Sequence, residues 1–194
     1  MKSTSLYHKV WYLILVFCLF WPLRVPGQDM PVPAKLQAAL FAKILTFDRE
    51  LKVRENNRLV IGIVYQEQVR ASSKAKEAFM KALTELNGNQ IFVFHCMPIN
   101  IGTETELTEQ IAQCDVDVIY IAPIRAIDIR IISQLSQKLQ KLTLTGVPKY
   151  VKQGLAAGID IHAGKPQILI NLPAARAQGA NFRSQLLKMT TVIQ

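Results

Sequence analysis

The sequence contains few of the residues that build catalytic or metal centres. Among its 194 residues only three are histidine and three are cysteine. It has no G-x-S-x-G segment, Walker loop or G-x-G-x-x-G segment, which mark serine hydrolases, P-loop NTPases and dinucleotide-binding folds. We expect His95, in an apolar strand, to be a core residue and His162, in a hairpin turn, to be exposed. Neither has an acidic neighbour at metal-ligand spacing. The sequence therefore predicts no metal ion, no cofactor and no enzymatic activity.

Long apolar runs are scarce as well. The run from Val10 to Trp21 has 12 residues, fewer than the about 20 that a membrane-spanning helix needs. A basic start precedes this run, Pro22 ends it, and small residues follow, which is the layout of a secretory signal peptide. We expect residues 1–27 to be a signal peptide and residues 28–194 to form one periplasmic domain that no longer spans the membrane. An uncleaved anchor is the alternative.

Acidic residues are outnumbered by basic residues, 14 to 23. Removal of residues 1–27 lowers the formal net charge from +9 to +6, because three basic residues and no acid lie in that segment. This excess of positive charge favours an acidic partner surface or anionic lipid headgroups. The basic residues are scattered and lack interleaved aromatic residues, so we expect no binding to nucleic acid.

Two cysteines remain in the exported part, Cys96 and Cys114. In an oxidising compartment such a pair favours a disulfide. Cysteine is also among the most frequently buried residue types, so two buried free thiols are the alternative. The sequence leaves both alternatives open.

The fold class follows from the strands. The segment Val116 to Pro123 (VDVIYIAP) is apolar on both faces, which predicts a strand buried between two layers. Similar strands are predicted at 58–65, 90–97 (where Pro98 would end the strand) and 142–147, and helical spacing predicts helices at 34–47, 72–86, 103–114 and 126–141. A hairpin at 155–171 and a helix from Pro173 follow. We therefore predict an α/β three-layer sandwich: a mixed, mostly parallel sheet with helices on both faces and a C-terminal hairpin plus helix.

Ligands of such sheets usually meet the loops at the carboxyl ends of the strands. Tyr65 and Gln66 end the first strand, and Arg125 follows the strand at Val116–Pro123. The guanidinium of Arg125 suits an anion or a partner's carboxylate, although a solvated loop arginine is the alternative. If the two strands are neighbours, these three residues form one binding rim. Asp115 and Asp117 flank the start of the same strand, at the opposite edge, and are interpreted as polar edge residues.

The end of the chain carries a recognisable pattern of spaced residues. It comprises Ile170-Asn171, Ala174-Ala175, Gly179, Phe182, Ser184 and Leu186-Leu187. This pattern resembles the closing segment of the YfiR-like family of exported α/β proteins. The early helix, the strand at Leu59–Val64 and the strand at Cys114–Ile121 also have counterparts in that family.

The resemblance implies a periplasmic regulator whose partner is an inner-membrane sensor protein. The characterised family member represses a membrane-bound diguanylate cyclase by engaging the periplasmic sensory part of that enzyme, and its release raises cyclic-di-GMP and biofilm formation. The alternative is a periplasmic small-molecule binding module that uses the rim of Tyr65, Gln66 and Arg125. An unrecognised hydrolase is the least favoured hypothesis, and a homo-oligomer is left open.

Overall fold

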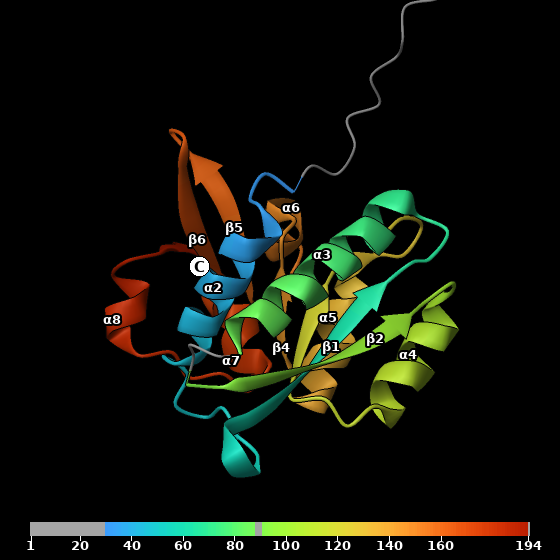
Figure 1. The fold of residues 1–194 in the computed structure, drawn as a ribbon, viewed down its shortest axis with the longest axis horizontal. Helices are drawn as coiled ribbons and strands as arrows, with labels where there is room; N and C mark the ends of the chain where they lie inside the picture. Colours follow the sequence, from blue (N-terminus) through green and yellow to red (C-terminus); the bar gives the residue numbers. More distant parts are fainter. Residues whose placement is uncertain (1–29, 88–90, 194) are drawn as a thin grey trace, which may run out of the picture.

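The computed structural model describes residues 30–87 and 91–193. The expected signal peptide, residues 1–27, lies outside the described residues. The described residues form a seven-stranded sheet in the order β2-β1-β3-β4-β5-β6-β7, flanked by helices (Figure 1). The strands are β1 (Arg58–Tyr65), β2 (Val93–Asn100), β3 (Val118–Ile121), β4 (Leu142–Thr145), β5 (Ala157–His162), β6 (Lys165–Asn171) and β7 (Thr191–Ile193). The helices are α2 (Ala34–Leu45), a short 3-10 helix (Glu55–Asn57), α3 (Arg70–Leu86), α4 (Glu104–Gln113), α5 (Ile129–Leu139), α6 (Pro148–Lys152), α7 (Leu172–Ala177) and α8 (Ser184–Leu187).

The sheet is mixed and mostly parallel, as predicted. Strands β2, β1, β3, β4 and β5 run parallel. Strand β6 returns antiparallel to β5 through the predicted hairpin turn, where Gly164 adopts a positive φ, and β7 pairs parallel with β6. Strand β3 lies inside the sheet, and all four of its residues are buried.

Two apolar cores, one on each face of the sheet, give the fold its three layers. Helices α2 and α3 cover the first core, and helices α4, α5 and α6 cover the second. Tyr120 of β3 anchors the first core: its ring stacks on Phe79 of α3 at 3.8 Å and meets Phe41 of α2 edge-on at 6.1 Å. Adjacent β3 residues alternate between the cores, which explains why the strand is apolar on both faces.

Local sequence signals fix several helix starts. Thr103 and Glu106 form a capping box at the start of α4. Asn171 caps α7 by accepting a hydrogen bond from the backbone N–H of Ala174. Asp128 caps α5 in the same way, by accepting from the backbone N–H of Arg130.

Strand β2 differs from its prediction. It continues through Pro98 to Asn100, because β2 pairs only with β1 and a proline is tolerated on an edge strand. The N–H of Ile101 donates to the carbonyl of Tyr65, so the nitrogen of Pro98, three residues earlier, faces the open edge. His95 is exposed rather than a core residue, because it points away from the first core near the start of this edge strand.

The end of the chain also differs from its prediction. The single helix expected from Pro173 is replaced by α7, α8 and the edge strand β7. Gly179 adopts φ 87° just after α7, which ends that helix. The segment between β4 and β5, for which no element was predicted, contains the short helix α6.

Candidate functional site

The predicted rim residues lie at one edge of the sheet. Strands β1 and β3 pair directly, with Val64 beside Ile121, so Tyr65, Gln66 and Arg125 all lie at their carboxyl ends. The strand order reverses between β1 and β3. Helix α3, which follows β1 in the chain, covers the first core, whereas helix α4, which precedes β3, covers the second core. Such a reversal is the place where open α/β sheets usually bind ligands.

Gln66 closes the gap between the two strand ends. Its side-chain oxygen accepts from the backbone N–H of Arg125 at 2.6 Å, and its Nε2 donates to the carbonyl of Arg125 at 2.9 Å. The Gln66 side chain is buried by this pairing, and its own backbone N–H donates to Oγ of Ser72 at 2.9 Å. Gln66 therefore positions the loop that carries Arg125, and its amide groups are already occupied.

The other two rim residues face different surroundings. Tyr65 is half-buried, and Nζ of Lys76 lies 4.6 Å from the centre of its ring, a cation–π contact. The Arg125 side chain is exposed, and the next residue, Ala126, adopts φ 57°. A positive φ outside glycine is uncommon, and it turns the chain directly after Arg125.

Two open hollows adjoin along this edge and share Arg125. The larger, of about 710 Å³, lies against the start of α3, and the smaller, of about 280 Å³, lies against α6. The basic residues that line them, here called the basic track, are Arg70, Lys74, Arg125 and Lys149. Neither hollow has an Asp or Glu in its lining.

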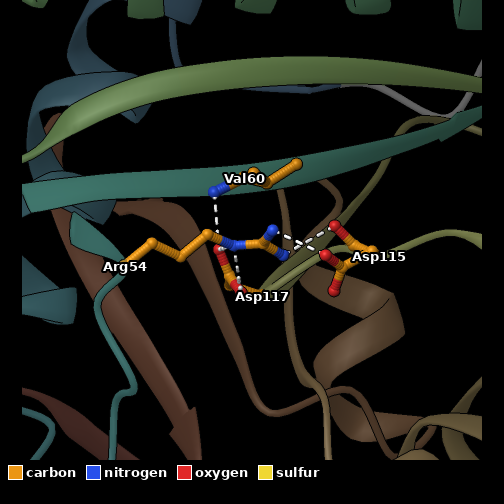
Figure 2. Close-up of polar contacts among 4 residues, drawn as sticks. All are labelled: Arg54, Val60, Asp115 and Asp117. Carbon is orange, nitrogen blue, oxygen red and sulfur yellow. Dashed lines mark hydrogen bonds and ion pairs between the residues drawn. The ribbon is translucent and has the colours of Figure 1, made fainter.

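The opposite edge of the sheet contains an ionic cluster that sequence reasoning missed (Figure 2). Arg54 Nε donates to Asp117 Oδ2 at 2.9 Å, and its Nη1 donates to Asp115 Oδ2 at 2.6 Å. Asp117 Oδ2 also accepts from the backbone N–H of Val60 of β1 at 2.8 Å. Hydrogen bonding to the Arg54 guanidinium holds the pKa of Asp115 below its usual range. The cluster joins the segment before β1 to the start of β3.

The family-like closing segment packs against this same edge. Gln178 is buried, and its side-chain oxygen accepts from the backbone N–H and the hydroxyl of Thr143 of β4, at 2.9 and 2.8 Å. Phe182 forms a backbone bridge with Asp48, whose carboxylate accepts from the N–H of Asn181 at 2.8 Å. The segment therefore fixes the amino edge of the sheet, and its role in these contacts is structural.

Cys96 and Cys114 are free thiols in the structure. The reason is geometric: Cys96 packs against the first core and Cys114 against the second, on opposite faces of the sheet. Burial raises the pKa of the Cys96 thiol to about 11. Among residues 30–87 and 91–193, no cluster of three or more His, Cys, Asp or Glu has the arrangement to hold a metal ion. No helix in these ranges is long and apolar enough to cross a bilayer.

The fold is that of a doubly wound α/β domain, and the hollows at the carboxyl ends of its strands are open and lined by basic residues. The chain belongs to the YfiR/HmsC-like family, whose model matches residues 34–191. This match confirms the resemblance inferred from the closing segment. No curated protein matches the chain.

Solved structures of bacterial proteins share the fold at low identity. One is an ABC domain in complex with L-Trp from Streptococcus pneumonia (15% identity, TM-score 0.63, covering 83% of this chain and 62% of that one). A second is a conserved domain protein from Vibrio cholerae O1 biovar El Tor (14% identity, TM-score 0.60, covering 84% of this chain and 60% of that one). A third is the ligand-free, open structure of CD0873, a substrate binding protein with adhesive properties from Clostridium difficile (16% identity, TM-score 0.56, covering 84% of this chain and 60% of that one). The chain thus spans about 60% of the length of these structures.

Proposed function

We propose that this protein is a non-catalytic periplasmic regulator that docks on the periplasmic part of an inner-membrane signalling protein, such as a diguanylate cyclase, and represses it. The observation that carries the proposal is the family match over residues 34–191. The family is one of periplasmic regulators, and the basic start followed by an apolar run is consistent with export.

The structure supports a docking role through its open carboxyl edge. The basic track lies on exposed loop and helix positions, and the loop that carries Arg125 is fixed by Gln66. A fixed backbone lowers the entropy lost on binding, which favours recognition by preformed contacts.

Cyclic-di-GMP measured in cells with and without the gene tests this function. Deletion is expected to raise cyclic-di-GMP, and a plasmid-borne copy is expected to restore the original level. An unchanged level after deletion would remove the cyclase from the proposal.

The second candidate function is a periplasmic small-molecule binding module. The structural neighbours favour it, because one was solved with L-Trp and another is described as a substrate binding protein. A small ligand that raises the melting temperature of the wild type, and does so less in Arg125→Ala, would support this function.

A further inference from the structure

The hollows at the two edges of the sheet differ in charge. The linings of the two hollows at the carboxyl edge contain the four basic side chains of the basic track and no carboxylate. At the amino edge, the hollow of about 370 Å³ mixes both signs, with Asp48 and Glu50 beside Lys52 and Lys141. Positive charge is therefore gathered in these two linings, at the edge where parallel sheets usually bind their ligands, whereas the nearby carboxylates of Glu67 and Asp128 are bonded to Asn100 and Arg130.

The charges of the basic track are not neutralised within the described part of the chain. None of its side chains forms an ion pair there, whereas Arg54 and Arg130 are paired with aspartates. Exposed cations that are left unpaired beside one another repel, and an acidic partner relieves that repulsion.

The backbone between the two hollows is held from both sides. Gln66 clamps both backbone groups of Arg125. The buried hydroxyl of Tyr150 accepts from the N–H of Ile124 at 3.0 Å and donates to the carbonyl of Ile124 at 3.0 Å. Arg70 and Lys74 are four residues apart on α3, so they lie on one face of that helix. The track is therefore presented on a preformed frame.

The shape of the edge suits a chain segment better than a small molecule. Sites for small ligands usually enclose most of the ligand surface in one concave cavity. Here two open hollows lie side by side and share Arg125. An extended segment with several carboxylates would contact both.

We propose that the basic track is the docking surface for an acidic segment of the partner protein. This inference rests on the proposed function for the existence of a protein partner. Repeated carboxylates of the segment would pair with the guanidinium and ammonium groups along the track, and Arg125 would be the central contact because both hollows include it.

A labelled oligoglutamate peptide tests the proposal by fluorescence anisotropy with the exported protein. The test variant combines Arg70→Gln, Lys74→Gln and Arg125→Gln. The control variant combines Lys138→Gln, Arg176→Gln and Arg183→Gln, which removes the same charge from exposed positions outside both hollows. We expect the test variant to lose about tenfold or more in affinity, because three exposed charge contacts disappear, and the control to change about twofold or less.

Three results would overturn the docking surface. They are equal losses in both variants, no binding of oligoglutamate by the wild type, and binding to anionic lipid vesicles without binding to oligoglutamate. The affinity of the wild type for oligoglutamate should fall as the salt concentration is raised, because salt screens exposed charge contacts. This result would support the docking surface without any variant. Circular dichroism of both variants checks that they fold.

The peptide measurement is independent of the proposed function. Failure to bind oligoglutamate, together with a rise of cyclic-di-GMP on deletion, would overturn the docking surface and leave the regulator standing. Binding that depends on the track, together with no effect of deletion, would support the surface and contradict the cyclase as partner.

Discussion

Gln66 and Arg125 are joined across the ends of β1 and β3 by a reciprocal pair of hydrogen bonds of 2.6 and 2.9 Å. Both backbone groups of Arg125 are satisfied by one buried side chain from the neighbouring strand end. The candidate binding loop is thereby tied to the sheet, and its position is a property of the fold.

The first prediction concerns this clamp. Gln66→Ala leaves the N–H and carbonyl of Arg125 without their partner, and we expect a loss of about 1–3 kcal/mol in the free energy of unfolding. Urea denaturation measures it. Gln68→Ala, at a neighbouring exposed position, is the control and should change stability by less than about 0.5 kcal/mol. Equal stability of the two variants would show that the clamp contributes nothing.

The second prediction concerns the cluster at the opposite edge. Asp117→Ala removes the acceptor of both Arg54 and the N–H of Val60, and we expect a loss of about 2–3 kcal/mol, because hydrogen bonds to charged groups are among the stronger ones. Asp115→Asn, at a side chain that is 82% exposed, should have a much smaller effect at neutral pH. Equal urea midpoints for Asp117→Ala and Asp115→Asn would contradict the larger contribution given to Asp117.

The third prediction is a pH dependence. The pKa of Asp115 is lowered in the folded state by its hydrogen bond to Arg54, so its contribution to stability is present above the unfolded pKa of about 4 and is lost as the pH falls through the folded pKa. Wild-type protein should therefore lose more stability than Asp115→Asn when it is acidified from about pH 6 to about pH 3. Urea denaturation at the two pH values measures the difference. Parallel losses in both proteins would contradict the role given to Asp115.

How far the sequence predicts this structure depends on how local the signal is. The buried strand at β3 and the hairpin of β5 and β6 each depend on neighbouring residues, and both are confirmed. The edge position of β2 is a property of the whole sheet, so the effect of Pro98 was misjudged.

The contacts of the site are less visible in the sequence. Arg54 and Asp117 are separated by 63 positions, and no motif links them. The rim of Tyr65, Gln66 and Arg125 was predicted from strand ends alone, and the structure brings these residues to one edge. The clamp by Gln66 depends on the exact path of two loops, which periodicity does not specify. Whether the rim binds a ligand or a partner stays a prediction.

The fourth prediction concerns the closing segment. Gln178→Ala removes a buried amide that bonds Thr143 and also donates to the carbonyl of Gly154 at 3.2 Å, so we expect a loss of about 2–3 kcal/mol. Gln185→Ala, at an exposed position of α8, serves as the control. A large loss in Gln178→Ala alone would fit a structural role of the closing segment. A negligible loss would show that the Gln178 contacts do not anchor this segment to the sheet.

The fifth prediction concerns the thiols. Because Cys96 and Cys114 pack on opposite faces of the sheet, a protein of residues 28–194 should take up an alkylating reagent at both cysteines when it is unfolded without reductant. In the folded state Cys96 should react slowly at neutral pH, since burial raises the pKa of its thiol to about 11 and the thiolate is the reactive form. Mass spectrometry reads both results. A Cys96–Cys114 peptide pair recovered without reductant would contradict the structure.

We propose that this protein restrains a membrane signalling enzyme through the basic track at its carboxyl edge. The most direct measurement is cyclic-di-GMP in deletion cells that carry the wild type, the Arg70→Gln/Lys74→Gln/Arg125→Gln variant, or the Lys138→Gln/Arg176→Gln/Arg183→Gln control, all at matched protein level. We predict that the wild type and the control restore a low cyclic-di-GMP level and that the track variant does not. Restoration by all three proteins, or no rise on deletion in the first place, would contradict the claim.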